Sequence, residues 1–182
     1  MTIRILIADD QPVVRDGLAM LLGLIDDVET VATAADGLEA VERARAERPD
    51  IVLMDLRMPR LAGAEATRQI LAALPDTRVL VLTTFVDDEF LFPALQAGAR
   101  GYLTKDASAE EIEQAIRAVA AGRTHLDPAV QQRLVEAVLN ARPAATIELP
   151  DALTAREAEI LRLIAAGLSN TEIAAALVVS GA

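Results

Sequence analysis

The chain has 182 residues, of which 53% are hydrophobic and 25% are charged, a balance typical of folded globular proteins and not of disordered ones. It contains no cysteine, which excludes disulfides and thiolate metal sites, and its formal net charge of −11 by itself argues against nucleic acid as a partner. No apolar run reaches the roughly 18 residues of a membrane span, and the first residues lack the layout of a signal peptide. We therefore expect a cytoplasmic protein without a membrane partner.

Short apolar runs separated by helical patterns predict the buried strands of a parallel sheet. The runs cover 5–8, 51–54, 79–82 and, more weakly, 101–104, and a more polar stretch over 29–34 has the pattern of an edge strand. Helices are expected over 12–24, from 36–37 to just before Pro49, over 62–74, from Asp87 to Gly98, and from a capping box at Ser108. Five successive strand–helix units predict a doubly wound parallel sheet with helices on both faces.

The pattern changes after Gly122. We predict a first domain over 1–122, a linker over 123–150 with one helix from Pro128 to about Asn140, and a third segment over 151–182. Two further capping boxes, at 154–157 and 169–172, predict a pair of helices in that last segment. His125 is the only histidine, and we interpret it as a loop residue because no residues typical of metal ligands stand beside it.

Polar residues directly follow the apolar strands, at the rim where the carboxyl ends of parallel strands meet. They are Asp9, Asp10, Asp55, Thr83 and Lys105. Clustered carboxylates repel one another unless a cation joins them, and Mg²⁺ suits such a site because it takes carboxylate and phosphate oxygens. Thr83 and Lys105 offer a hydrogen-bond donor and a positive charge to phosphoryl oxygens. Asp55 is a candidate nucleophile, since aspartyl phosphates are an established covalent intermediate.

These residues, with the stretch 54–59 around Asp55, resemble the receiver domain of bacterial two-component response regulators. The resemblance implies a flavodoxin-like sheet of five strands in the order 2-1-3-4-5. It also implies that Asp55 is the phospho-acceptor, that Asp10 binds Mg²⁺ directly, and that Asp9 binds it largely through water. The implied remaining roles are a metal-binding backbone carbonyl at Arg57, phosphoryl binding by Thr83 and Lys105, and an aromatic switch at Tyr102 that moves inward with Thr83.

A different class of protein also combines a strand-end aspartate nucleophile with Mg²⁺. Haloacid-dehalogenase-type phosphatases need a second acid two residues after the nucleophile, where this chain has Arg57, which cannot supply a proton at neutral pH. The lack of a positioned acid or base favours a switch that holds its phosphate. We therefore expect no enzyme, and at most slow autodephosphorylation at Asp55.

The stretch from Leu153 to Ser180 resembles the start of a LuxR-type helix-turn-helix domain, here a partial all-α domain. A receiver followed by this domain is the arrangement of NarL/FixJ-type regulators. It implies that a sensor histidine kinase phosphorylates Asp55, which switches homodimerisation and DNA binding for transcriptional control. Since the recognition helix would follow Ser180, we expect DNA binding by a full-length protein and not by these 182 residues. The alternative is a receiver-type interaction module whose output is another protein.

Overall fold

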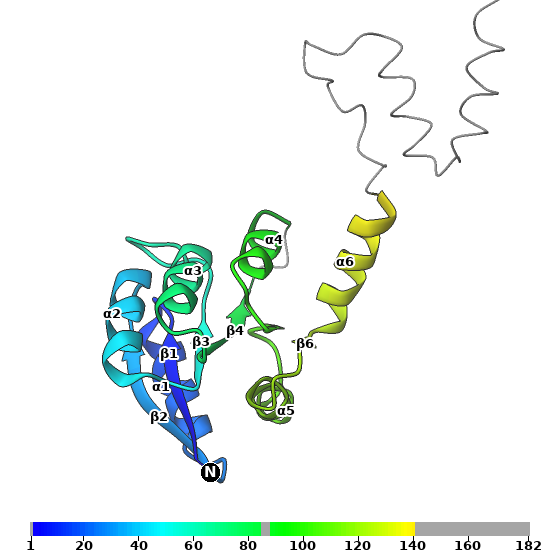
Figure 1. Cartoon of the computed structure of the whole chain (residues 1–182). Coiled ribbons are helices and arrows are strands. Elements are labelled where there is room, and N and C mark those ends of the chain that lie inside the picture. Colours follow the sequence, from blue (N-terminus) through cyan, green and yellow to red (C-terminus); the bar gives the residue numbers. More distant parts are fainter. Residues whose placement is uncertain (1, 85–87, 141–182) are drawn as a thin grey trace, which may run out of the picture. The chain divides into compact units, whose positions relative to one another are not determined.

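The computed structural model describes residues 2–84 and 88–140 (Figure 1). Contacts divide the chain into two compact units, Met1–Val138 and Leu139–Ala182, and the first of these is described below. The helices predicted at 154–157 and 169–172 lie outside the described residues. Within the described part of the chain, no helix is long and apolar enough to cross a membrane.

One parallel sheet of six strands forms the centre of the first unit, in the order β2-β1-β3-β4-β5-β6. The strands are β1 (Ile3–Ala8), β2 (Val28–Ala34), β3 (Ile51–Met54), β4 (Arg78–Thr83), β5 (Gly101–Thr104) and β6 (His125–Leu126). The predicted class and the predicted order of the first five strands are confirmed. Neighbouring parallel strands place their carboxyl ends at the same rim of the sheet, which is where the candidate residues lie.

The prediction of five strands was wrong by one, because β6 extends the sheet beyond β5. His125 pairs with Gly101 and Leu126 pairs with Tyr102 in parallel register. His125, interpreted from the sequence as a loop residue, therefore lies in a strand. A strand of only two residues has neither an apolar run nor a visible alternation, so the sequence carries no signal for it.

Helices cover both faces of the sheet (Figure 1). The helices of the described residues are α1 (Pro12–Leu22), α2 (Gly37–Glu47), α3 (Gly63–Ala73), α4 (Asp88–Gln96), α5 (Ala109–Ala120) and α6 (Pro128–Asn140). Ile5 and Ile7 of β1 pack in one core with α1 and α5, whereas Leu6 and Ala8 pack in a second core with α2 and α3. Burial on both faces explains why the central strands are continuously apolar.

Capping residues begin α2 and α5 where the sequence predicts. Ser108 and Glu111 form the predicted reciprocal capping box at the start of α5. Asp36 caps α2 by accepting a hydrogen bond from the backbone N–H of Glu39. The predicted cap Asp87 lies outside the described residues, and α1 ends at Leu22, two residues before its predicted end.

The start of α6 packs against β5 and α4. The backbone N–H of Asp127 donates to the carbonyl oxygen of Tyr102 at 2.9 Å. Val130 is completely buried in a cluster that also contains Tyr102 and Leu91. These contacts make β6 and the first turns of α6 part of the packed first unit.

Candidate functional site

The fold brings the five predicted rim residues together. Asp9 and Asp10 follow β1, Asp55 follows β3, Thr83 ends β4, and Lys105 follows β5. Carboxylate oxygens of the three aspartates lie within 4.8 Å of one another. Asp9 and Asp55 are buried, whereas Asp10 is exposed at the rim. The structure thus places the acidic cluster where the strand pattern predicts it.

Lys105 joins the two buried carboxylates. Its ammonium nitrogen lies 2.6 Å from Oδ2 of Asp9 and 2.9 Å from Oδ2 of Asp55. Burial alone would lower the pKa of Lys105, but the hydrogen bonds to Asp9 and Asp55 outweigh that effect and raise its pKa above the ordinary value. Lys105 therefore stays charged and offsets part of the negative charge of the cluster.

Backbone N–H groups hold the other oxygen of each buried carboxylate. Leu56 donates to Oδ1 of Asp55 at 2.7 Å, and Gln11 donates to Oδ1 of Asp9 at 2.9 Å. Both aspartates therefore have one oxygen on a backbone N–H and the other on the same ammonium group. This fixes the orientation of both carboxylates at the rim.

The hydroxyl of Thr83 lies buried at the end of β4. Its side chain is completely buried, and Oγ1 has no hydrogen-bond partner among the described residues. A buried hydroxyl without a partner is uncommon in folded proteins and costs free energy. Because Thr83 stands at the carboxyl end of β4, beside the β3 end that carries Asp55, its hydroxyl is available to an oxygen that arrives at this rim.

The donor set fits a divalent cation. The three aspartates supply hard carboxylate oxygens at a spacing that one ion can bridge, which is the ligand type that Mg²⁺ prefers. Arg57, whose carbonyl was predicted as a further ligand, lies in the loop between β3 and α3. Its guanidinium group sits 5.9 Å from the centre of the Phe90 ring. The side chain of Arg57 thus contacts α4, whereas the metal prediction concerns only its backbone carbonyl.

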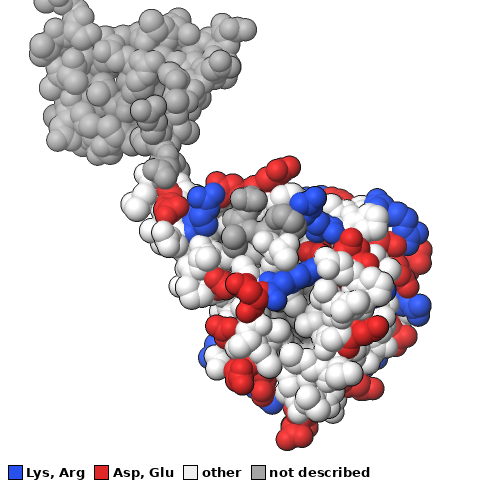
Figure 2. Space-filling view, turned by 180° about the vertical axis from the view of Figure 1, so that it is seen from behind, with Lys and Arg blue, Asp and Glu red and all other residues white. Residues whose placement is uncertain are grey.

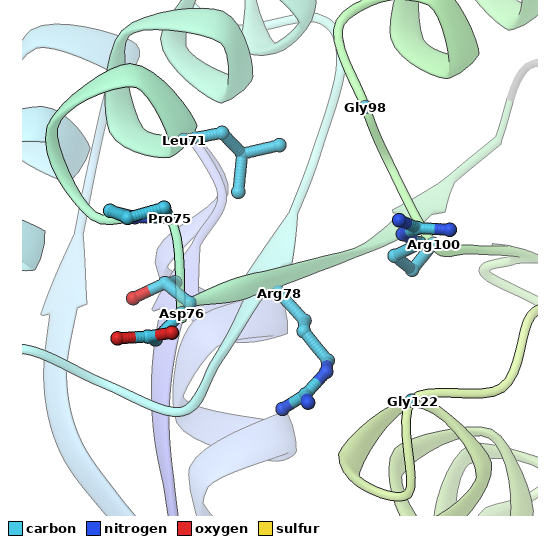
Figure 3. Close-up of a pocket in the computed structure, with 8 residues that line it drawn as sticks. Leu71, Pro75, Asp76, Arg78, Gly98, Arg100 and Gly122 are labelled. Atoms are coloured by element: carbon cyan, nitrogen blue, oxygen red, sulfur yellow. The ribbon is translucent and has the colours of Figure 1, made fainter.

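A cavity of about 450 Å³ lies at the opposite end of the sheet (Figure 3). Arg78 and Arg100 line it, close to Gly98 and Gly122, which follow the carboxyl ends of α4 and α5. Helix carboxyl ends carry partial negative charge, which nearby arginines stabilise. The two arginines that line the cavity therefore have a role in the fold itself, and the acidic rim remains the candidate functional site.

Comparison with known families decides the wider identity. Residues 5–117, well over half of the chain, match the family described as the response regulator receiver domain. The chain belongs to the response regulator family. Residues 151–182 match a second family, described as bacterial regulatory proteins of the luxR family. The arrangement is therefore that of a two-component response regulator for transcriptional control, of the NarL type that the sequence predicts.

Individual relatives of this response regulator agree with that arrangement. The oxygen regulatory protein NreC of Staphylococcus carnosus (strain TM300) is 44% identical over 181 residues, which are 97% of this chain and 83% of NreC. A two-component response regulator of the LuxR family from Aurantimonas sp. SI85-9A1 is 40% identical, with a TM-score of 0.72 over 76% of this chain and 99% of that one. The receiver domain of NarL from Mycobacterium tuberculosis is 36% identical, with a TM-score of 0.64 over 67% of this chain and 98% of that one.

Some contacts of the receiver site were not predicted from the sequence. Arg15 on α1 donates to the backbone carbonyl of Asp9 at 2.6 Å, a tertiary contact for which no local pattern exists. The hydrogen bond from Gln11 to Asp9 is a local turn of the kind that aspartate favours, and the residue type two positions earlier is its only signal. Tyr102, the predicted switch residue, is completely buried beside α4 and α6.

Proposed function

We propose that a sensor histidine kinase transfers a phosphoryl group to Asp55 of this response regulator in the cytoplasm, and that the phosphorylated state changes dimerisation and DNA binding. The observation that supports this proposal is the buried carboxylate of Asp55, held by Lys105 and by a backbone N–H. Beside it lies the hydroxyl of Thr83, which has no partner among the described residues. A nucleophile, a cation and a hydrogen-bond donor are the groups that phosphoryl transfer to a carboxylate needs.

The transfer forms a bond between phosphorus and a carboxylate oxygen of Asp55. The bond between phosphorus and the donor histidine nitrogen breaks, and that nitrogen keeps the electron pair. Mg²⁺, held by Asp9, Asp10, Asp55 and the carbonyl of Arg57, would supply charge neutralisation for the phosphoryl oxygens. The Thr83 hydroxyl donates to one phosphoryl oxygen, which gives a partner to a group that has none among the described residues. The ammonium of Lys105 pairs with another.

Asp55 is proposed as an acceptor and not as part of a turnover catalyst. The residue two positions after Asp55 is Arg57, which stays protonated at neutral pH and cannot serve as a general acid or base. Hydrolysis of the acyl phosphate would therefore depend on water that no side chain at that position activates. A phosphate that persists is what a signalling switch requires.

The proposed signal leaves the site through Tyr102 and α6. A phosphoryl group adds about −1.5 to −2 charges, which would draw Thr83 and Lys105 toward it. Tyr102 lies on β5, next to β4, and packs with Val130 of α6. Arg133 of α6 also pairs with Asp88 of α4 at 3.2 Å. A change at Thr83 would thus bias the packing of the helix that connects the receiver to the LuxR-family segment.

We infer that two copies of the chain dimerise through their receivers and that the LuxR-family segment is the part of the protein that binds DNA. On α1, Val13 and Met20 are 84% and 76% exposed and lie seven residues apart, on one face of the helix, and Leu24, two residues past its end, is 84% exposed. Such an apolar stripe is suited to a second copy of the chain. By contrast, the receiver face in Figure 2 carries interspersed acidic and basic side chains, which is no footprint for DNA.

The direct test uses a small phosphodonor, which replaces the kinase. Wild-type protein with Mg²⁺ should gain the mass of one phosphoryl group, and Asp55→Asn should gain none. Labelling of the variant to the wild-type extent would contradict the assignment of Asp55.

A further inference from the structure

An ion pair between the buried Asp36 and the 58%-exposed side chain of Arg60 ties the loop after Asp55 to the start of α2. Asp36 is only 6% exposed, and its Oδ2 accepts a hydrogen bond from Nε of Arg60 at 2.7 Å and a second one from Nη2 of the same guanidinium. Its other oxygen, Oδ1, accepts from the backbone N–H of Glu39 at 3.0 Å. One carboxylate therefore caps α2 and holds the β3–α3 loop, because two guanidinium nitrogens donate charge-assisted hydrogen bonds to one of its oxygens.

The backbone of α2 also lies directly against this loop. A Cβ atom at Gly37 would come within 2.1 Å of the carbonyl oxygen of Leu61, so only glycine permits this approach. The ion pair between Asp36 and Arg60 thus acts across an interface that is already in backbone contact. The loop has little room to move toward α2, and the ion pair keeps it from moving away.

The other end of the loop is fixed to β3 and α3. The backbone N–H of Gly63 donates to the carbonyl oxygen of Leu56 at 2.9 Å, and a Cβ at Gly63 would lie 2.0 Å from the carbonyl oxygen of Asp55. Met58 is buried in the core under α2 and α3. Arg57 therefore lies between anchored positions, of which Met58 is held by apolar packing and Arg60 by its ion pair with Asp36.

Arg60 itself adopts a backbone conformation that side chains disfavour. Its φ angle is +63°, in the left-handed region that residues other than glycine seldom occupy. Such a conformation persists only where the surroundings impose it. The bond to Asp36 is the contact of the Arg60 side chain that can impose it.

We propose that Asp36 and Arg60 are positioning residues for the metal site, acting through the backbone of the β3–α3 loop on the carbonyl of Arg57. The inference rests on the proposed function, in which that carbonyl is a Mg²⁺ ligand. Its physical content is that the loop is held in the metal-binding conformation before the ion arrives. Outer contacts that orient metal ligands commonly affect metal affinity by about tenfold or more.

The test is the Mg²⁺ dissociation constant of the 182-residue chain, measured by calorimetry for wild type and Arg60→Gly. Glycine removes the ion pair while accepting the positive φ, so the variant separates the two effects. Removal of the Asp36 side chain is avoided because it would also remove the cap of α2. Arg68→Ala is the matched control, since Arg68 on α3 is an exposed arginine paired with Glu65 and its loss changes the net charge equally.

We expect Arg60→Gly to weaken Mg²⁺ binding by about threefold to tenfold, a little below the usual effect of outer contacts because a backbone carbonyl is one ligand of several. Arg68→Ala should bind as wild type does, and Arg60→Lys should recover part of the affinity. Hydrogen exchange of the amides in residues 56–61 should be faster in Arg60→Gly, which reports the loop without any activity.

Equal dissociation constants for wild type and Arg60→Gly would overturn the inference, as would an equal loss in Arg68→Ala. If Arg60→Gly does not fold, Arg60→Lys decides the question, because it keeps the charge and loses the second hydrogen bond. If wild type binds no Mg²⁺ at all, the proposed metal site itself is wrong. That outcome differs from one in which wild type and Arg60→Gly both bind Mg²⁺ with the same dissociation constant.

Discussion

Lys105 lies 2.6 Å from Asp9 and 2.9 Å from Asp55, so one ammonium group serves two buried carboxylates from different strands. It is also the only lysine in the chain. In the absence of a metal, this contact is what lets two acids stay close together at the rim. The first prediction concerns a variant that lacks the ammonium group of Lys105.

Lys105→Ala should destabilise the protein while leaving Mg²⁺ binding largely intact. Breaking a fully buried ion pair costs about 3–5 kcal/mol, and at this solvent-reached rim we expect about 1–3 kcal/mol. Added Mg²⁺ should restore part of the loss, because it replaces the missing positive charge. Urea unfolding with and without Mg²⁺ measures both quantities.

Phosphorylation-dependent dimerisation should also weaken in Lys105→Ala. A variant that dimerises on phosphorylation as wild type does would count against a role for Lys105 in the switch.

In wild type, isotope-labelled lysine gives a single side-chain NMR signal, because Lys105 is the only lysine. That signal should shift when Mg²⁺ or a phosphodonor is added.

Thr83→Val should separate signalling from stability. The hydroxyl of Thr83 is buried without a partner among the described residues, so replacing it by a methyl group should leave stability unchanged or raise it by up to about 1 kcal/mol. The phosphoryl group would lose its hydroxyl donor, so phosphorylation should no longer change the environment of Tyr102. Because Tyr102 is the only tyrosine and the chain has no tryptophan, tyrosine fluorescence reports that residue alone.

The control is Thr30→Val on β2, since Oγ1 of Thr30 is the other buried hydroxyl without a partner among the described residues. It should change stability in the same direction and leave the fluorescence response to phosphorylation intact. A full response in Thr83→Val would remove Thr83 from the switch.

Val130→Ala tests the proposed route into α6. Val130 is completely buried against Tyr102, and deleting two buried methyl groups should cost about 1–3 kcal/mol. Phosphorylation should then change hydrogen exchange in α6 less than it does in wild type. Arg133→Ala, which removes only the exposed ion pairs with Asp88 and Glu136, should cost less than about 1 kcal/mol and serves as the comparison. An unchanged exchange response in Val130→Ala would mean that the signal bypasses this contact.

Acid should weaken the protein partly through Asp36. Burial alone would raise the pKa of Asp36, but the backbone N–H of Glu39 and the guanidinium of Arg60 outweigh it and hold the pKa below the ordinary 3.8. A lowered folded-state pKa contributes stability that is fully present above the unfolded pKa and is lost as pH falls through the folded value. Asp36→Asn keeps a good helix cap but has no charge to lose.

The stability difference between wild type and Asp36→Asn should therefore be constant between about pH 5 and 8 and should narrow below about pH 4. Urea unfolding of both proteins at several pH values measures it. A difference that grows as the pH falls would contradict the role of the ionised Asp36.

Most of the fold and the residues of the rim could be predicted from the sequence, because both follow from short-range patterns. The four apolar runs were long enough to predict buried parallel strands, and polar residues at their carboxyl ends must share a rim. The sixth strand could not be predicted, because two residues carry no pattern. Its pairing depends on the position of Gly101, which is set by the rest of the sheet.

Contacts within the site were harder to predict than its residues. The sharing of Lys105 between Asp9 and Asp55 requires distances that strand order alone does not supply. The bond between Asp36 and Arg60 joins residues 24 positions apart in two loops, and neither loop has a motif that names the other. Side-chain pairing of this kind is decided by tertiary packing.

The most direct test of the central claim is phosphorylation of the chain by a small phosphodonor in the presence of Mg²⁺, followed by intact-mass measurement. The account predicts one added phosphoryl group on wild type, none on Asp55→Asn, and loss of the label when Mg²⁺ is removed before the reaction. Undiminished labelling of Asp55→Asn, or labelling that needs no Mg²⁺, would contradict it.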